Sequence, residues 1–306
     1  MVEFKESFIE TYKELTNIKD FKEYSLKKLI KSIRVNTLKI SILKLKKRLE
    51  NQGFKLKQIP WCKEGFWVIK GPRTDLGNLK EHSLGYIYIQ EAASMIPPLD
   101  LKPTSKDLVL DMSAAPGSKT TQLASMMKNR GLIVANDYKY DRLKALNMNL
   151  QRSGVSNTII TLSEGRHFLK SEIKFDKILL DAPCSGTGAI RKSLKTLQMW
   201  NPNMFKKLAG TQKQLISVAF SILKNKGTLV YSTCSVAPEE NEAIIDFLLK
   251  ENSNAKLQSI DLQIKKSDPI LEYKKDKYSK EIKKCLRIWP QDNDTEGFFI
   301  AKIKKN

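Results

Sequence analysis

The sequence contains no run of eighteen apolar residues, so it predicts no membrane-spanning helix. Its first fifteen residues, MVEFKESFIETYKEL, are acidic and polar and predict no signal peptide. The hydrophobic content of 41% is that of a soluble globular protein, and 306 residues are enough for about two domains. We expect a cytoplasmic protein that contacts no membrane, and we expect it to be a monomer.

Potential metal ligands are scarce. The four cysteines are far apart and form no C-x-x-C pair: they are Cys62, Cys184, Cys234 and Cys285. The sequence has only two histidines, His82 and His167. A zinc site needs about four such ligands at short spacings, so we predict no metal. Free thiols in a chain of this kind indicate a reducing compartment.

The two common glycine patterns for phosphate binding are also missing. The segment 111–120 (DMSAAPGSKT) joins an expected strand to an expected helix, but it offers only Gly117 where a dinucleotide site needs three glycines. A P-loop needs glycine before Lys119, and this chain has Ser118. The small residues still allow a ligand close to the backbone, and Asp137 at the next strand end is placed to accept hydrogen bonds from a ribose diol. The turn therefore predicts an adenosine-type cofactor.

Positive charge is abundant. The chain has 54 lysines and arginines against 33 acids, a formal net charge of +21, with a pI near 9.7. Solvated lysines spread over the surface account for part of this excess. Lys22 to Lys57, however, contains twelve basic residues and two acids, a net +10. This clustering favours a polyanionic partner, and nucleic acid is the most plausible one.

Residues 1–98 are expected to form a small α+β module that binds nucleic acid. Residues 1–32 have the apolar spacing of one or two amphipathic helices. We expect strands at 32–38, 54–59 and 66–69, a basic helix at 40–51, and a strand in 84–98 that passes into a short helix ended by Pro97 and Pro98.

From residue 99 onward, apolar strands alternate with helices, which is typical of a parallel sheet covered on both faces. We therefore predict a second domain at 99–306. Its expected strands are 108–112, 132–136, 158–162, 175–180 and 227–231, with a closing strand near 297–303; its expected helices are 120–128, 141–153 and 212–223. The basic stretch 265–287 is expected to be a surface excursion.

Two of the predicted strands end in polar segments that contain a cysteine. Asp181 and Cys184 follow the strand at 175–180, and Cys234 follows the strand at 227–231. After Cys234, Pro238 and three glutamates are suited to the first turn of a helix. A lone cysteine is more often a buried filler. Two of them at the edge where open α/β sheets bind their ligands favour chemistry.

Taken in order, DMSAAPGSKT, LLDAPCSGTG and YSTCSVAPEENE resemble the NOL1/NOP2/Sun (RsmB-like) family of RNA cytosine-C5 methyltransferases. The resemblance covers about residues 30–304, and its architecture is closest to the archaeal tRNA-modifying members. It implies a Rossmann-like, S-adenosylmethionine-dependent methyltransferase domain with a mostly parallel seven-stranded sheet, together with a small N-terminal α+β module.

The resemblance also implies roles for individual residues. Cys234 matches the nucleophile, Cys184 matches a second cysteine that helps to release product, and Asp181 matches the acid that contacts base and cofactor. The positions that match S-adenosylmethionine contacts are Ser113, Ala114, Ala115, Pro116, Gly117, Ser118, Lys119, Asp137, Arg142, Glu164 and Asp181. The family usually has cysteine, glycine and aspartate where this chain has Ser113, Ser118 and Glu164.

The resemblance implies RNA as the substrate, with tRNA the first expectation and rRNA the second. Two other functions stay open at this point. One is a non-catalytic RNA-binding protein with a relic fold, against which the intact Cys184, Cys234 and Asp181 argue. The other is a methyltransferase of the same fold that acts on an exocyclic amine or a protein, for which no cysteine nucleophile is needed.

Overall fold

The computed structural model describes residues 4–306. Residues 1–3 of the predicted N-terminal helical region lie outside the described residues. Among the described residues, no helix is long and apolar enough to cross a membrane.

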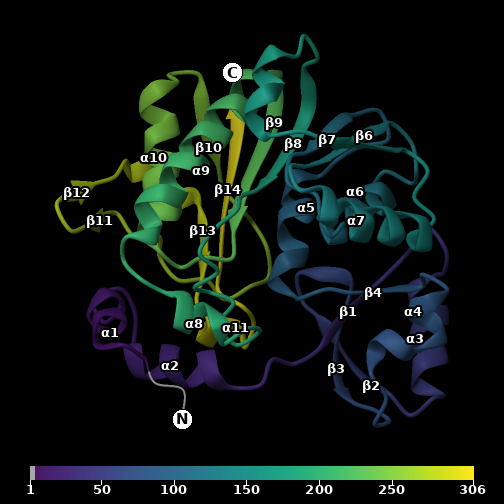
Figure 1. Ribbon diagram of the computed structural model, residues 1–306. Coiled ribbons are helices and arrows are strands. Elements are labelled where there is room, and N and C mark those ends of the chain that lie inside the picture. The colour runs from purple at the N-terminus through teal and green to yellow at the C-terminus, as the bar shows by residue number, and fades with distance from the viewer. Residues whose placement is uncertain (1–3) are drawn as a thin grey trace.

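The N-terminal part contains a four-stranded antiparallel sheet in the order β2-β3-β1-β4 (Figure 1). Its strands are β1 (Ser32–Val35), β2 (Lys55–Ile59), β3 (Cys62–Lys70) and β4 (Ile87–Ile89), and its helical segments are α3 (Ile42–Glu50), η1 (Leu76–Asn78) and α4 (Lys80–Ser83). Leu45 and Leu49 of α3 are buried against Ile33 and Phe66 of the sheet. The predicted strand, helix and strand order is therefore present, with β3 longer at its start than expected.

Helices α1 (Glu6–Tyr12) and α2 (Ile18–Leu26) do not pack on this sheet. Phe8, Tyr12 and Phe21 form an apolar cluster with Trp200 and Trp289 of the C-terminal part. Figure 1 accordingly shows the two helices on the opposite side of the molecule from β2 and β3. The predicted division after residue 98 stays a prediction.

The C-terminal part is built on a sheet whose strands follow the order β10-β14-β9-β8-β5-β6-β7. The strands are β5 (Leu108–Asp111), β6 (Leu132–Asp137), β7 (Thr158–Leu162), β8 (Phe175–Asp181), β9 (Leu223–Thr233), β10 (Ala255–Gln258) and β14 (Phe298–Lys305). Strands β7, β6, β5, β8 and β9 pair in parallel, whereas β14 and β10 pair antiparallel. This is the predicted mostly parallel, seven-stranded sheet, and β13 (Leu286–Ile288) adds an eighth strand on β14.

Helices cover both faces of the large sheet. The main ones are α5 (Ile96–Leu101), α6 (Ser118–Met126), α7 (Tyr140–Ser153), α9 (Met204–Ser221) and α10 (Glu242–Glu251). The other helical segments are η2 (Ala93–Met95), η3 (Gly165–Lys170), η4 (Pro238–Glu240), η5 (Lys280–Lys284), α8 (Lys195–Met199) and α11 (Pro290–Asn293), of which α8 and α11 lie near α2 (Figure 1). Successive strand residues supply the two cores because side chains alternate along a strand. Leu180 packs with α9 and α10, whereas Leu179 packs with α5 and α6.

Several predicted boundaries were wrong. Pro97 and Pro98 do not end a helix; they occupy the first turn of α5, where a missing N–H costs no hydrogen bond. Helix α9 begins at Met204, eight residues before the predicted start. A 3-10 turn at Pro238 precedes α10, which begins at Glu242. The stretch 265–287 is only partly the predicted surface excursion: it contains a short hairpin of β11 (Glu272–Tyr273) and β12 (Asp276–Lys277), followed by η5, but Ile282, Cys285 and Arg287 are buried.

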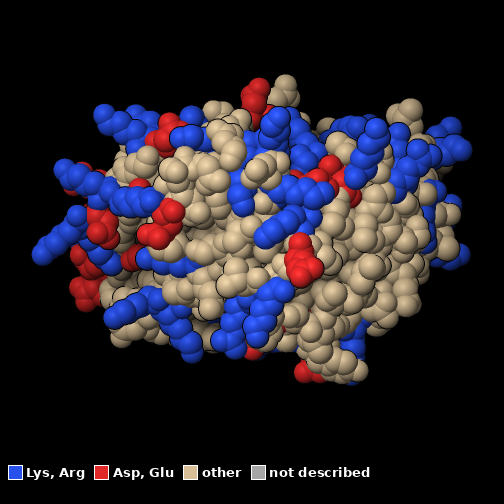
Figure 2. All heavy atoms as spheres, turned by 90° about the horizontal axis from the view of Figure 1, so that it is seen from above, with Lys and Arg blue, Asp and Glu red and all other residues tan. Residues whose placement is uncertain are grey.

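The positive charge is spread over the surface. Figure 2 shows lysine and arginine side chains over much of the face seen from above, with acidic side chains between them. Several basic side chains of the stretch from Lys22 to Lys57 form ion pairs within the protein. Lys27 pairs with Asp294, and Arg48 pairs with Glu81. The net +10 is therefore not all available to a ligand.

Candidate active site

The parallel pairing of β8 and β9 brings the two predicted cysteines together. Asp181 lies opposite Ser232 in the register, so the turns that follow both strands leave the sheet at one edge. Cys184 and Cys234, fifty positions apart in the sequence, approach to 3.4 Å between their Sγ atoms. Both are half-buried, whereas Cys62 and Cys285 are buried in the two apolar cores.

The two thiols are electrostatically linked. The hydrogen bond with Cys234 is the largest cause that raises the pKa of Cys184 well above its usual value, and burial and the charge of Glu240 act in the same direction. Cys184 is therefore held as a thiol at neutral pH. The pair can thus supply one nucleophilic sulfur and one sulfur that keeps its proton.

Asp181 stands beside this pair and is held on both oxygens. Lys119 Nζ lies 2.6 Å from Oδ2, and Ser232 Oγ donates to Oδ1 at 2.7 Å. Burial alone would lower the pKa of Lys119, but the carboxylates of Asp181 and Asp111 outweigh it, so the pKa lies above its usual value. The ammonium thus stays charged inside the site and fixes the Asp181 carboxylate.

The turn after β5 forms another wall. Gly117 has φ of +103°, a conformation that L side chains rarely adopt, and α6 begins at the next residue. Ala114 N–H donates to the Asn136 carbonyl at 2.7 Å, which fixes the turn on the neighbouring strand. Burial raises the pKa of Asp111 at the strand end to about 7, and Thr120 donates to its Oδ2.

Asp137, predicted for a ribose diol, is buried at the end of β6. Its carboxylate accepts hydrogen bonds from the N–H groups of Ala115 and Lys139, and Arg142 pairs with it at 3.2 Å. Arg142 also donates to the Ala115 carbonyl at 2.5 Å. In this arrangement Asp137 and Arg142 support the turn.

A cavity of about 610 Å³ lies between these elements. Of the predicted site residues, it is lined by Ser113, Ala115, Arg142, Glu164, Asp181, Cys184 and Cys234. Ala114, Pro116, Gly117, Ser118, Lys119 and Asp137 stand behind this lining, in the turn, in α6 and at the end of β6. Glu164 is exposed at the rim and pairs with Arg166 at 2.6 Å.

Sequence reasoning missed part of the lining. Met112, Asn136, Tyr138, Gly165, Arg166, Ala182, Pro183, Leu208, Thr211, Gln214 and Leu215 also face the cavity. Most of them adjoin predicted positions and could have been included as neighbours. Leu208, Thr211 and Leu215 come from α9, whose helical spacing was available in the sequence.

The cavity fits an adenosine-type cofactor. Its volume is within the range of small-molecule sites, about 300–1,000 Å³. Met112, Tyr138 and Leu215 give it apolar walls, and Asp181 and the two thiols stand at the chemical end. Within residues 4–306, no group of three or more potential ligands is arranged to hold a metal ion.

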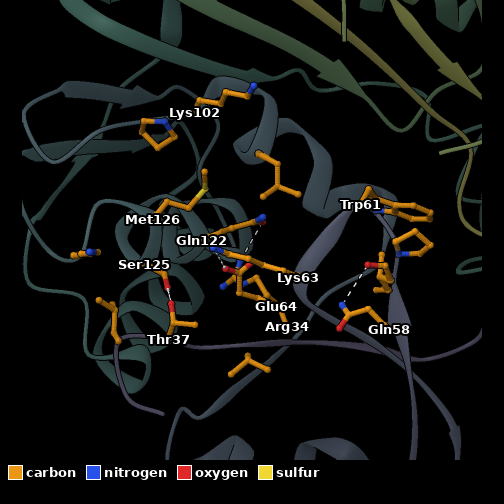
Figure 3. Close-up of a pocket in the computed structure, with 17 residues that line it drawn as sticks. Arg34, Thr37, Gln58, Trp61, Lys63, Glu64, Lys102, Gln122, Ser125 and Met126 are labelled. Carbon is orange, nitrogen blue, oxygen red and sulfur yellow. Dashed lines mark hydrogen bonds and ion pairs between the residues drawn. The ribbon is translucent and has the colours of Figure 1, made fainter. Parts of the chain in front are cut away.

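A larger cavity of about 1090 Å³ lies between the small sheet and helices α5 and α6 (Figure 3). It shares no lining residue with the cysteine cavity. Lys63 and Glu64 both line it and form an ion pair at 3.7 Å, in which the Lys63 side chain is largely exposed. Figure 3 shows this pair close to Arg34 and Gln122. Because it contains no thiol and part of its charge is paired internally, we do not place the chemistry there.

Two family models match the chain. Residues 98–304 match "16S rRNA methyltransferase RsmB/F", and residues 4–92 match "N-terminal domain of 16S rRNA methyltransferase RsmF".

Individual relatives cover nearly the whole chain. The chain is 47% identical to a tRNA (cytosine(49)-C(5))-methyltransferase of Pyrococcus abyssi, over 99% of both chains. It is 44% identical to ribosomal RNA small subunit methyltransferase F of Psychromonas ingrahamii, over 94% of this chain and only 60% of that protein.

Solved structures agree with these matches. A methyltransferase homologue from Pyrococcus horikoshii superposes with a TM-score of 0.89 at 39% identity, over 100% of this chain and 96% of that one. NSun6 from Pyrococcus horikoshii with SFG superposes with a TM-score of 0.85 at 26% identity, over 99% and 98% of the two chains.

Proposed function

Because the chain belongs to the RsmB/F (NOL1/NOP2/Sun) family of RNA cytosine-C5 methyltransferases, we propose that it methylates cytosine C5 in tRNA, with S-adenosylmethionine as cofactor and Cys234 as nucleophile. The supporting observation is the meeting of Cys184 and Cys234 at 3.4 Å beside Asp181, at the end of a cavity of cofactor size. Neither a relic fold nor an amine methyltransferase requires this thiol pair.

The chemistry explains why a thiol is needed. C5 of cytosine is a poor nucleophile, so the ring must first be made electron-rich. The Cys234 thiolate forms a bond to C6, the C5–C6 double-bond electrons shift through C4 towards N3, N3 takes up the proton that the Cys234 thiol has lost, and C5 becomes enamine-like. This covalent step divides one difficult reaction into easier ones. Asp181, fixed by Lys119 and Ser232, is positioned to orient the base through N3 and the exocyclic amine.

S-adenosylmethionine supplies an electrophilic methyl group at its sulfonium. We assign its binding to the cavity walls formed by Ser113, Ala115, Arg142 and Glu164, with the turn at Gly117 behind them. These residues would hold and orient the cofactor when it is bound. Asp137 contributes by holding Ala115 and Arg142 in place.

Release of product requires two further events on the RNA. The proton at C5 must leave, and its bonding electrons then re-form the C5–C6 double bond as the Cys234–C6 bond breaks. Cys184 is close enough to Cys234 to take part in this elimination. Because the hydrogen bond with Cys234 and burial keep Cys184 protonated, its thiol can give a proton to the departing Cys234 sulfur while the C5 proton passes to water, so we assign Cys184 to release and not to attack.

The relatives favour tRNA over rRNA. The chain spans nearly the whole of the Pyrococcus abyssi tRNA enzyme but less than two thirds of the bacterial rRNA enzymes. Cytosine 49 of tRNA is therefore the first position to test. We assign RNA docking to the module at residues 1–98. The cytoplasmic location and monomeric state stay predictions.

Incubation with labelled S-adenosylmethionine tests the proposal directly. Transcribed tRNA with cytosine at position 49 should gain methyl groups that bisulfite sequencing places at that position, whereas a 16S rRNA transcript should gain few. Cys234→Ala should abolish transfer and form no adduct with 5-fluorocytosine RNA. Cys62→Ala serves as the control, since Cys62 is buried outside the cavity. Appreciable turnover by Cys234→Ala would refute the nucleophile assignment.

A further inference from the structure

Glu240 lies beside the two cysteine-bearing turns. The sequence suggested only that it suits the first turn of a helix, yet its side chain is fully buried in the 3-10 turn before α10. A buried carboxylate without hydrogen bonds would be costly, so its partners show which groups it holds.

Four hydrogen bonds from three parts of the fold converge on this carboxylate. Ser185 donates from its backbone N–H to Oε1 at 2.9 Å and from its hydroxyl to Oε2 at 2.5 Å. Ser235 Oγ also donates to Oε2 at 2.5 Å, and Gln212 Nε2 of α9 donates to Oε1 at 3.0 Å. Burial raises the pKa of Glu240 above its usual value, and these bonds act against that rise. To the ionised carboxylate they are charge-assisted, and such bonds are stronger and shorter than those between neutral groups.

The serines are the immediate neighbours of the cysteines. Ser185 follows Cys184, and Ser235 follows Cys234. One carboxylate thus ties together the turn after β8 and the turn after β9, the two turns whose relative position sets the distance between the thiols. Neutral hydrogen bonds also join the two turns: Gly188 N–H donates to the Cys234 carbonyl at 2.9 Å, Val236 N–H donates to Thr187 Oγ1 at 3.1 Å, and the Ser235 hydroxyl lies 3.1 Å from those of Ser185 and Thr187.

We propose that Glu240 is a positioning residue, which holds Cys184 and Cys234 at the separation that attack and release require. The proposal rests on the function proposed above, because that function gives the thiol pair its role. Glu240 itself acts on the substrate only through the two turns and is not a catalytic residue.

Glu240→Gln is the direct test because it keeps the shape and removes the charge. The serine hydroxyls can turn to accept from the Gln amide, so the links remain but become bonds between neutral groups, which are weaker. Misplacement of a reacting group by about 1 Å costs on the order of 100-fold in rate, and we expect kcat to fall roughly 10- to 100-fold. KM for RNA and for cofactor should change less than about twofold, since neither binding surface is altered.

Neighbouring substitutions separate this role from a general effect on folding. Glu239→Gln is the matched control. Glu239 is the neighbouring residue in the sequence, but its carboxylate pairs with the exposed Lys274 at 3.0 Å. The kcat of the Glu239→Gln variant should therefore equal that of the wild-type protein. Ser185→Ala removes one hydroxyl donor and leaves the backbone donor, so it should lower kcat less than Glu240→Gln. Circular dichroism confirms that each variant is folded.

Phenylarsine oxide, which binds two adjacent thiols, reports the geometry without turnover. Its affinity should fall about tenfold in Glu240→Gln and stay unchanged in Glu239→Gln, as expected for a change in thiol separation. Unchanged arsenical affinity and unchanged kcat in a folded Glu240→Gln protein would overturn the proposal. If the wild-type protein methylates no RNA while Glu240→Gln still loses arsenical affinity, the proposed function is wrong and the positioning role stands.

Discussion

Replacement of Arg34 by methionine should weaken the contact between the small N-terminal sheet and α6, the helix that follows the turn at Gly117. Arg34 is on β1 and is only 3% exposed. Its guanidinium donates to Gln90 Oε1 at 2.7 Å, Ser118 O at 2.9 Å, Gln122 Oε1 at 3.2 Å and Thr121 Oγ1 at 2.8 Å. Three of these acceptors belong to α6, the helix that begins directly after Gly117 in the turn that follows β5.

The expected loss can be worked from these contacts. Hydrogen bonds to a charged group contribute about 1.5–3 kcal/mol each, but the cost of burying the charge offsets part of the sum. That cost is visible here, because burial lowers the pKa of Arg34 to about 10. The group stays charged at neutral pH, and methionine fills most of its volume. We expect a loss of about 2–4 kcal/mol in the free energy of unfolding, because the substitution leaves neutral buried acceptors without their donor and no unpaired charge behind.

Urea unfolding followed by circular dichroism measures this loss. Arg130→Met is the matched control, since Arg130 is exposed and its replacement should change the free energy by less than about 0.5 kcal/mol. Cofactor affinity, measured by calorimetry, should also fall in Arg34→Met because the Ser118 carbonyl loses its anchor. A loss below about 1 kcal/mol with unchanged cofactor affinity would refute the view that Arg34 couples the two parts.

Three further predictions concern release, docking and pH. Cys184→Ala should accumulate a denaturant-resistant adduct with unmodified cytosine RNA because release stalls, and denaturing gels should show none for the double variant with Cys234→Ala. Charge reversal at Lys44 and Lys47, both exposed on α3, should weaken RNA binding and flatten the slope of log K against log salt by about 0.7–0.9 per lost phosphate contact. An unaltered slope would move the docking surface elsewhere. Burial raises the pKa of Asp111 to about 7. The folded chain therefore holds a proton that the unfolded chain has lost between about pH 4 and 7, and stability falls as pH rises through this window. Asp111→Asn should remove that fall in thermal unfolding measured across pH, and an equal fall in the variant would assign it to another group.

The meeting of the cysteines could be predicted because it depends on order along the sheet. Two apolar strands that both end in polar turns place those turns at one edge whenever the strands run parallel. The register of Asp181 against Ser232 then brings Cys184 and Cys234 together. No long-range side-chain information was needed for this step.

The roles of the charged residues could not be predicted in the same way, since partners distant in sequence decide them. Glu242 looked like an acid at a helix start, yet it forms a buried ion pair with Arg287, forty-five positions away. Arg48 looked available for RNA, yet it pairs with Glu81. Net charge computed from composition gives every charged residue the same weight. In the structure, some of these residues form ion pairs within the protein, whereas others, such as Lys44, are exposed to solvent.

The distribution of charge around the thiol pair supports different roles for two chemically identical groups. The Lys119 ammonium is close enough to Cys234 for the thiolate to raise the pKa of Lys119, and it also holds the Asp181 carboxylate. On the other side, the negative Glu240 contributes to the raised pKa of Cys184. A negative neighbour disfavours a thiolate. The hydrogen bond with Cys234, burial and the charge of Glu240 therefore all favour the thiol at Cys184, the form expected of a group that acts in release and not in attack.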